Sequence, residues 1–367
     1  MDPSTPISAT SPAQEVTVYT GDDLAHAGLH TQTARAMHAF SIYRQGLTDN
    51  TRLRQHNDLE SFCTYLGLVS VSRTVDELEQ HPSAWQGITA SLVAGFQLWL
   101  ESQGYAVGTI NVRLATIRQY CQLVRDADLI TQEELLAIKD VKGKSGKTAR
   151  NVDRDRQRRG VPTRIGHKKA AATEVTTAQV FALKKPVPPT RQLKRIHDQL
   201  LVARDALLMG LLFEHALRCG EVAGLNLENF NLADCTFTVY REKTDETTLQ
   251  ILHKHTRIAA ETYLALLKQG IPGQLEPRTT GPLFTGYKGE RLSKRAINAR
   301  VGVLGKQAGI AGLSPHDARH FWAYDALRNG TPLDKVKSGG NWHSDSMPLR
   351  YAKRGAISNE GVRISEE

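Results

Sequence analysis

Apolar residues recur at intervals of three and four between residues 30 and 141 of the chain. That period is typical of the buried face of a helix, and no strand-like alternation interrupts it. It predicts five helices, over residues 30–47, 48–68, 89–104, 109–129 and 131–141. Their expected buried faces include Leu53, Leu59, Phe62 and Leu66 in the second helix and Ile110, Leu114, Ile117, Cys121 and Val124 in the fourth. We therefore expect this part of the chain to be a compact, all-helical domain.

The pattern changes in the second half of the chain. Residues 197–217 are apolar on nearly every side, which predicts a central buried helix. In residues 235–255 the period becomes two around a Thr244-Asp245-Glu246 turn, with Phe237, Val239, Leu249 and Ile251 as the apolar positions, so a β-hairpin is expected. Further helices are predicted at residues 176–185, 254–270, 293–309, 315–330, 332–340 and 344–354. The fold class is thus mainly α with a small β-hairpin or sheet, as an all-helical domain followed by a mixed α+β domain.

Basic residues are concentrated between the two parts. From Lys142 to Lys169 only Asp153 and Asp155 oppose the cations, and the whole chain carries a net charge of +9. Two compatible interpretations are a solvated, disordered linker and a flexible segment that follows phosphates. The expected organisation is a disordered lead over residues 1–25, a helical domain over 26–141, a basic linker over 142–172, a second domain over 173–354 and a tail over 355–367.

The sequence also lacks the features that are typical of several protein classes. No apolar run approaches the roughly 20 residues of a membrane helix, and the N-terminus does not resemble a signal peptide. The four cysteines form no C-x-x-C pair, which indicates buried thiols in a reducing compartment. There is no phosphate-binding loop, H-E-x-x-H motif, G-x-S-x-G motif or carboxylate cluster, so neither a metal nor a cofactor is expected.

A series of cations and hydrogen-bond donors runs through the second domain. Each of these residues taken alone is explained by capping, packing or solvation. Their order along the chain is what indicates a common site: Arg218 with Glu221 three residues on, Lys243 at the hairpin tip, His316 with Arg319 three residues on, and Trp342 with Tyr351 nine residues on.

In order and spacing this set resembles the tyrosine recombinases, also called the phage integrase family. "ALRCGEVAGL" resembles the family's first arginine box, "HDARH" its His-x-x-Arg box and "NWHSDSMPLRY" the box that ends on tyrosine. The helical domain resembles the family's core-binding, SAM-like domain. An extra early helix, the paired glycines before Trp342 and the closing tail are most similar to the Cre-type simple recombinases. Two departures are Gly340-Asn341-Trp342 in place of the common Leu-Gly-His, and Ala216 in place of a common glycine.

The resemblance implies a chemistry for each residue. Tyr351 would attack a DNA phosphodiester and form a 3′-phosphotyrosine, without metal or ATP. Arg218, Arg319 and Trp342 would stabilise the transition state, with His343 as the alternative donor beside Trp342. Lys243 would be the general acid, His316 would accept the tyrosine proton or bind the phosphate, and Glu221 would orient Arg218 or His316.

The resemblance also implies partners. The protein would clamp double-stranded DNA in a C-shape at inverted repeats. It would act as a homotetramer on two sites, and as a monomer or weak dimer when free, with the tail swapped between protomers and no membrane partner. A cytoplasmic, nucleoid-associated protein of a prokaryote or phage is expected. The cations expected to contact DNA are Arg113, Arg118, Arg158, Arg159, Lys294, Arg295 and Arg300.

Two alternatives stay open at this stage. A type IB topoisomerase or a telomere resolvase would share the same catalytic residues, although the chain length and the compact helical domain favour a recombinase. A DNA-binding regulator without catalysis is the alternative of another class, and the complete residue set argues against it.

Overall fold

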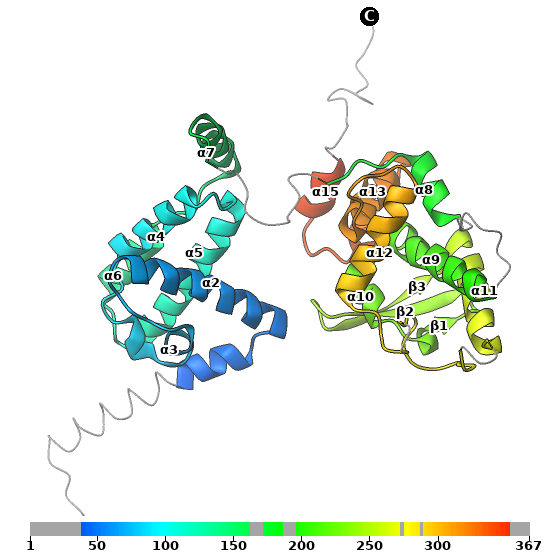
Figure 1. Ribbon diagram of the computed structural model, residues 1–367, viewed down its shortest axis with the longest axis horizontal. Coiled ribbons are helices and arrows are strands. Elements are labelled where there is room, and N and C mark those ends of the chain that lie inside the picture. Colours follow the sequence, from blue (N-terminus) through cyan, green and yellow to red (C-terminus); the bar gives the residue numbers. More distant parts are fainter. Residues whose placement is uncertain (1–37, 162–171, 186–195, 272–274, 287–288, 353–367) are drawn as a thin grey trace, which may run out of the picture. The chain divides into compact units, whose positions relative to one another are not determined.

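The computed structural model describes residues 38–161, 172–185, 196–271, 275–286 and 289–352 of the chain. The chain divides into two compact units, Met1–Lys168 and Lys169–Glu367 (Figure 1). The boundary between the units falls inside the basic segment. The expected disordered lead and C-terminal tail lie outside the described residues.

The first unit is helical throughout its described residues. Residues 38–45 are helical. They are followed by α2 (Asp49–Leu68), α3 (Val75–Gln80), the 3-10 helix η1 (Pro82–Trp85), α4 (Ala90–Ser102), α5 (Val107–Asp126), α6 (Gln132–Asp140) and α7 (Gly146–Arg158). The hydroxyls of Thr48, Thr89 and Thr131 accept hydrogen bonds from the first turns of α2, α4 and α6, which fixes where these helices begin. The helices predicted within the described residues are confirmed, and α3, η1 and α7 are additions.

The core of the first unit is aromatic. All five apolar residues predicted to face inward from α5 are buried. Phe62 and Tyr120 stack on opposite sides of Trp85, with ring centroids 6.0 and 5.3 Å from the indole. The prediction for Leu53 was wrong, because this residue is 63% exposed. The predicted Leu59 and Phe62 are buried, and Asp58 is buried beside them.

Helix α7 occupies a segment that was interpreted as a disordered linker. Ser145 caps its first turn. Arg156 is 1% exposed and donates from Nε and Nη2 to the carbonyl of Glu101, at 3.1 and 2.8 Å. The disordered interpretation is therefore wrong for residues 146–158, whereas residues 162–171 lie outside the described part. The apolar period could not reveal this helix, because a buried guanidinium takes the place of an apolar face.

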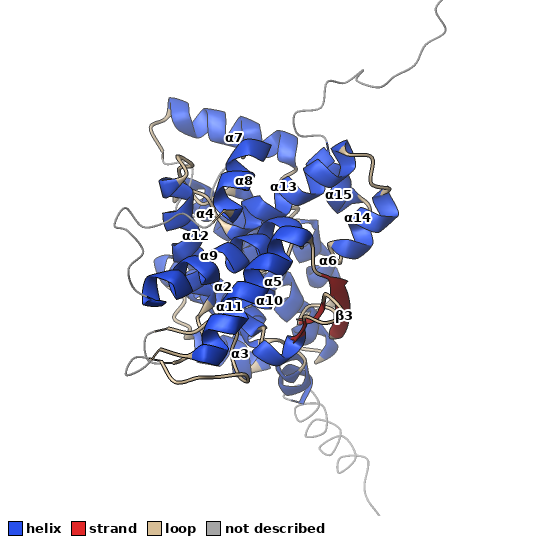
Figure 2. Ribbon diagram, turned by 90° about the vertical axis from the view of Figure 1, so that its right-hand side faces the viewer, coloured by secondary structure: helices blue, strands red, loops and turns tan. Residues whose placement is uncertain are grey.

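The second unit combines helices with a small antiparallel sheet (Figure 2). Its elements are α8 (Thr177–Lys184), α9 (Ile196–Glu214), α10 (Cys219–Gly224), η2 (Leu227–Asn229), β1 (Phe230–Asn231), β2 (Thr236–Arg241), β3 (Glu246–Ile251), α11 (Lys254–Gln269), α12 (Lys294–Gln307), α13 (Pro315–Arg328), α14 (Leu333–Gly339) and α15 (Ser346–Ala352). The strand order is β1-β2-β3. The predicted hairpin and helices are confirmed, and so is the fold class.

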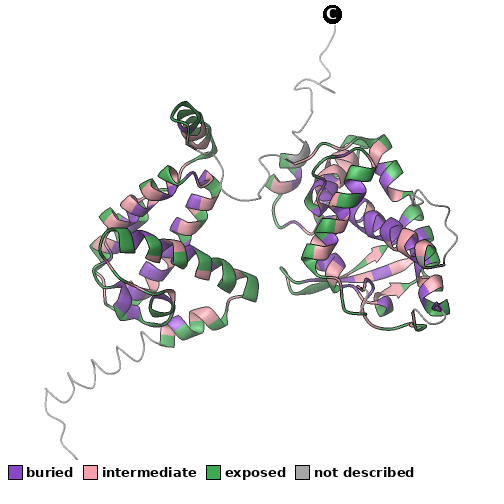
Figure 3. Ribbon diagram, in the orientation of Figure 1, coloured by how far each residue is buried: buried purple, intermediate pink, exposed green. Residues whose placement is uncertain are grey.

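Helix α9 is the centre of the second unit, as predicted. It packs against α8, α10, α11 and α13, and Leu207, Leu211 and Leu212 on it have no exposed surface (Figure 3). Strand β2 turns Phe237 and Val239 into this core and Phe230 of β1 packs against it, whereas Leu249 and Ile251 of β3 are exposed. None of the helices in the described parts of the chain combines the length and the apolar character that crossing a membrane requires.

A buried histidine lies just beyond the end of α9. His215 is 4% exposed, and its ring centroid lies 5.0 Å from those of Phe237 and His253. Burial, and then the charge of His253, lower the pKa of His215 from 6.5 to about 3. His215 is therefore neutral in the folded protein at neutral pH.

This burial makes the stability of the second unit sensitive to acid. Between pH 6.5 and about 3 the unfolded chain binds a proton at His215 that the folded chain does not. The free energy of unfolding should therefore fall as pH falls through this window, by about 1 kcal/mol per pH unit. Hydrogen exchange of α9 at pH 7 and pH 5 measures it. His215→Gln should flatten the dependence, whereas His81→Gln, at an exposed position, should leave it intact. An unchanged slope in His215→Gln would contradict the assignment.

Candidate active site

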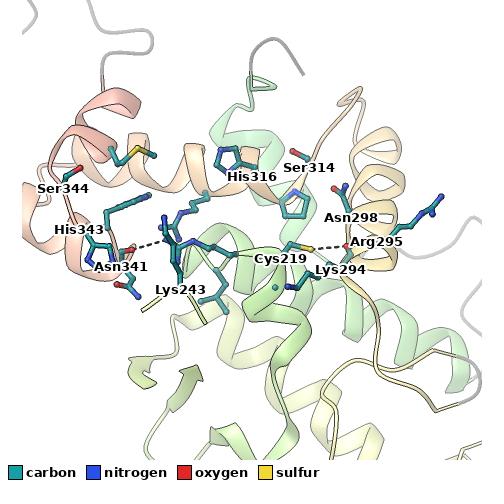
Figure 4. A pocket seen from close by; sticks show the side chains of 17 residues that line it. Cys219, Lys243, Lys294, Arg295, Asn298, Ser314, His316, Asn341, His343 and Ser344 are labelled. Atoms are coloured by element: carbon teal, nitrogen blue, oxygen red, sulfur yellow. Dashed lines mark hydrogen bonds between the residues drawn. The ribbon is translucent and has the colours of Figure 1, made fainter. Parts of the chain in front are cut away.

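A cleft of about 930 Å³ opens in the second unit and gathers five of the residues predicted to be catalytic (Figure 4). They come from four separate parts of the unit: the start of α10, the β2–β3 turn, the start of α13 and the segment after α14. The five are Arg218, Lys243, His316, Arg319 and Trp342. Residues separated by more than a hundred positions thus share one cavity.

Glu221 holds the first arginine in place. Arg218 precedes the first turn of α10, and its backbone N–H and Nη1 each donate to the Glu221 carboxylate at 2.7 Å. The Glu221 oxygen that accepts the Arg218 backbone N–H also accepts from Nη1 of Arg241 at 2.6 Å. Arg218, one of the two partners considered for Glu221, is therefore in direct contact with it.

Two backbone carbonyls orient the second arginine. Arg319 is 3% exposed. It donates to the carbonyl of Ala216 at 2.6 Å, and also to the carbonyl of Gly340. Ala216 has φ +52°, in the left-handed region that favours glycine. This conformation explains why glycine is common at that position in the family.

Trp342 is packed between this arginine and the hydrophobic core. The guanidinium carbon of Arg319 lies 4.2 Å from the indole centroid, and Trp342 is 7% exposed. A Cβ on Gly340 would lie 2.1 Å from Cζ3 of the indole, so residue 340 has no room for a side chain. His343, the alternative donor, is exposed and also lines the cleft.

His316 and Lys243 are both exposed at the cleft. Partial removal from water, and then the positive charge of Arg319, lower the pKa of His316 below its ordinary value of 6.5. The imidazole is therefore neutral at neutral pH and able to accept a proton. Lys243 lies in the four-residue turn between β2 and β3, as predicted.

Tyr351 belongs to α15, and its side chain lies outside the described part of the structure. Helix α15 packs against α13 and α14 and contributes Met347 to the lining of the cleft. The helix of the expected nucleophile thus borders the cavity. The role of Tyr351 stays a prediction, as do the roles of the five lining residues.

The cations expected to contact DNA have different surroundings. Lys294 and Arg295 line the cleft, and Arg158 is exposed on α7. The remaining four have partners within the fold: Arg113 lies 4.0 Å from the Tyr105 ring centroid, Arg118 donates to the Val141 carbonyl, Arg159 pairs with Asp155 at 2.6 Å, and Nε of Arg300 donates to Asp205 at 3.0 Å. DNA contacts by all seven stay predictions.

Two residues beside the site were not predicted. Arg241 is 1% exposed. A signal for it was available, because the two-residue period that buries Phe237 and Val239 also turns residue 241 inward. Asn341 accepts a hydrogen bond from Arg218 and has φ +48°. Its signal was an asparagine where the family commonly has glycine.

The composition of the cleft defines what it can bind. Arg218, Lys243, Lys294, Arg295 and Arg319 give it a strong positive charge, and there is no carboxylate among its lining residues. Elsewhere in the described residues no group of three or more His, Cys, Asp or Glu is gathered as in a metal site. Planar guanidinium groups held in fixed positions suit the non-bridging oxygens of a phosphate. The fold and the residues of the cleft are therefore those of a protein suited to bind a phosphodiester.

Comparison with known sequences agrees with this class. Residues 190–356 match the family described as the phage integrase family. The tyrosine recombinase XerC of Herpetosiphon aurantiacus is 23% identical over 300 residues, which cover 82% of this chain and 83% of that protein. The XerC of Pseudomonas fluorescens strain Pf-5 is 32% identical over 142 residues, which cover 39% of this chain and 45% of that protein. The chain thus matches less than half the length of this second relative.

Solved structures show the same fold at low identity. A Tn1549 transposon integrase in complex with transposon right end DNA has a TM-score of 0.60 and 12% identity, over 89% of this chain and 97% of that chain. A lambda integrase tetramer bound to a Holliday junction has a TM-score of 0.53 and 14% identity, over 90% and 78%. Residues 190–356 of this chain form a phage integrase family domain, and the similarity to tyrosine recombinases supports an enzyme that cleaves and rejoins DNA. The family resemblance is confirmed, and the Cre-type affinity stays a prediction.

The contact between Gly340 and Trp342 can be tested by a single methyl group. Gly340→Ala would place its Cβ against the indole and force Trp342 out of its position. We expect a loss of about 1–3 kcal/mol in unfolding free energy, because the neighbouring core cannot yield without strain. Thermal unfolding measures it.

The matched control is Gly302→Ala in α12, where the nearest atom to the new Cβ is 3.8 Å away. This variant should unfold at or slightly above the wild-type temperature, because alanine favours a helix. Equal stability of the two variants would contradict the tight packing at Gly340.

Proposed function

We propose that the protein is a site-specific DNA recombinase that acts through a 3′-phosphotyrosine intermediate formed by Tyr351. The observation that carries the proposal is the cleft that gathers Arg218, Lys243, His316, Arg319 and Trp342 beside the helix of Tyr351. In the reaction the Tyr351 oxygen bonds to the phosphorus and the bond to the 5′-oxygen breaks. Because the covalent link preserves the bond energy, a 5′-hydroxyl of another strand can later displace the tyrosine without ATP.

The transition state carries more negative charge on the non-bridging oxygens than the phosphodiester does. Arg218 and Arg319 are held before DNA arrives, by Glu221 and by two backbone carbonyls respectively. Donors fixed in advance lose no energy to reorganisation as charge develops, and removal of one typically costs about 10²–10³ in rate. Trp342 is the proposed third donor, with His343 as its neighbour.

Two proton transfers accompany the displacement. A phenol with a pKa near 10 is a weak nucleophile at neutral pH, so neutral His316 is the proposed acceptor of the Tyr351 proton. The 5′-oxygen leaves as an alkoxide unless it is protonated, and Lys243 is the proposed donor. The remaining role considered for His316, a hydrogen bond to the phosphate, uses the same position.

The proposed substrate is duplex DNA with inverted repeats around a short spacer, bound by a homotetramer that holds two sites and passes through a Holliday junction. In support, solved proteins of this fold include an integrase on transposon-end DNA and an integrase tetramer on a Holliday junction. A C-shaped clamp of the two units and a swapped tail belong to the same proposal. Action on DNA implies a cytoplasmic, nucleoid-associated enzyme.

Replacement of the nucleophile tests the reaction. Tyr351→Phe removes only the attacking oxygen, so the variant should bind DNA as wild type does and form no covalent complex. Denaturing gel electrophoresis of a nicked suicide substrate measures the complex, and sequencing of the DNA retained by the variant identifies the site.

The topoisomerase and the regulator each have their own outcome in this experiment. Relaxation of plasmids without any enriched site would indicate a type IB topoisomerase. DNA binding by wild-type protein without a covalent product would indicate a regulator. Cleavage by Tyr351→Phe would rule out Tyr351 as the nucleophile.

The protonation state of His316 predicts a pH profile. Because its pKa lies below 6.5, the imidazole is mostly neutral as pH falls from 8 to 7. The single-turnover cleavage rate at saturating DNA should therefore hold over that range and decline only below it. In His316→Gln the rate should be about 10²-fold lower and should lack the acid decline. A wild-type rate that is already half lost at pH 7 would contradict the role.

A further inference from the structure

Five hydrogen bonds form a closed ring behind the cleft. Arg218 donates to Glu221 at 2.7 Å, and Arg241 donates to the other oxygen of the same carboxylate at 2.6 Å. The backbone N–H of Thr244 donates to the carbonyl of Arg241 at 2.9 Å. Asn341 donates from Nδ2 to the hydroxyl of Thr244 at 3.1 Å, and its own carbonyl accepts from Nη2 of Arg218 at 3.2 Å. The ring therefore joins the first arginine, the hairpin turn and the segment that leads into Trp342.

In the sequence, Lys243 lies between Arg241 and Thr244, which are both members of this ring. On one side of it Arg241 is buried, paired with Glu221 and hydrogen-bonded from Nε to the Thr248 hydroxyl at 3.2 Å. On the other side Thr244 is held by Asn341. Lys243 itself is exposed and lines the cleft (Figure 4). The turn is therefore anchored at both ends while the lysine side chain is directed to the cavity.

The link from Asn341 to Thr244 differs from the other links in the ring. The contacts of Glu221 are charge-assisted and largely buried, whereas this one joins two neutral, partly buried side chains. A neutral hydrogen bond contributes only about 1 kcal/mol. It also connects two segments that are 97 residues apart in the chain. It is therefore the link at which the hairpin turn and the Trp342 segment can separate.

Residue 341 is suited to this contact by its backbone. With φ +48° it adopts the left-handed conformation that glycine and asparagine tolerate best. Glycine would satisfy the backbone equally well, but it has no side chain to reach Thr244. Asparagine therefore tolerates this backbone conformation as glycine does, and its side chain adds the contact with Thr244.

We propose that Asn341 is a positioning residue for Lys243, whose turn it holds at the cleft only while the segment carrying Trp342 is seated. The proposal rests on the proposed function and deepens it. Delivery of the proton to the leaving oxygen then depends on the same segment that leads to the Tyr351 helix. The acid and the nucleophile are thereby brought to one phosphate together.

The test compares two leaving groups on the same suicide DNA. One substrate carries the natural bridging 5′-oxygen, and the other carries sulfur at that position. A thiol has a pKa near 8.5, so a thiolate leaves without a proton donor. Asn341→Gly should cleave the oxygen substrate about 10- to 100-fold more slowly than wild type, since small misplacement of a catalytic group has effects of that size. With the sulfur substrate its rate should return to near the wild-type value, as should that of Lys243→Ala.

Variants of the partner residue sharpen the result. Thr244→Val keeps the shape and removes the hydroxyl, so it should reproduce Asn341→Gly, and Thr244→Ser should recover the lost rate. The double variant Asn341→Gly, Thr244→Val should be no slower than Thr244→Val alone, because both changes remove the contact between these two residues. Thr244→Val also removes the hydrogen bond that the Thr244 hydroxyl donates to the Arg241 carbonyl at 3.4 Å. Tyr240→Phe is the matched control, since it removes a hydrogen bond to Asp245 in the same turn, outside the ring. It should cleave at the wild-type rate.

Two outcomes would overturn the proposal: wild-type cleavage of the oxygen substrate by Asn341→Gly, or an equal loss on both substrates, which would indicate damage to Arg218 or the fold. A measurement without DNA distinguishes failure of the positioning role of Asn341 from failure of the proposed function. Hydrogen exchange in residues 242–245 should rise in Asn341→Gly and Thr244→Val and stay low in Thr244→Ser. If wild-type protein forms no covalent complex, the proposed function fails. Unchanged exchange would overturn the positioning role in either case.

Discussion

The carboxylate of Glu221, shared by two guanidinium groups, is the interaction on which the rest of the site depends. One oxygen holds Arg218 at the cleft and the other holds Arg241 beneath the hairpin. Arg241 is buried and the side chain of Arg218 is 32% exposed. Two cations this close together would repel each other strongly without the anion between them, and removal of one member of a buried pair typically costs about 3–5 kcal/mol. The positive charge of the cleft is thus partly neutralised by Glu221, which is not among the residues that line the cavity.

A second constraint is that donors for a phosphate must be rigid before the phosphate arrives. The structure achieves this with backbone atoms as much as with side chains. The carbonyls of Ala216 and Gly340 hold Arg319, and the carbonyl of Asn341 holds Arg218. Ala216 and Asn341 both have left-handed backbones. Sharp turns therefore present oxygens to the arginines from segments that are far apart in the sequence.

Much of this arrangement could be predicted from the sequence, and the reasons are local. The apolar period located α5 and α9, the alternation located the hairpin, and the order of the polar residues indicated a common site. What escaped prediction depends on tertiary contacts. Helix α7 has a buried Arg156 where an apolar face would be expected, and Leu53 lies on the outer side of α2. The alternation of β2 turns Arg241 inward but does not reveal that Glu221 pairs with it. The spacing of residues in the sequence does not show which cation pairs with which carboxylate in the folded protein.

The packing of Gly340 against Trp342 has a consequence for how such sequences vary. The atoms that a Cβ at position 340 would strike are Cζ3, Cε3 and Cη2 of the indole, all in its six-membered ring. An imidazole has no counterpart to that ring. A chain with histidine at position 342 would lack the atoms that exclude a Cβ at position 340. The requirement for glycine at position 340 is therefore a consequence of the tryptophan two residues later.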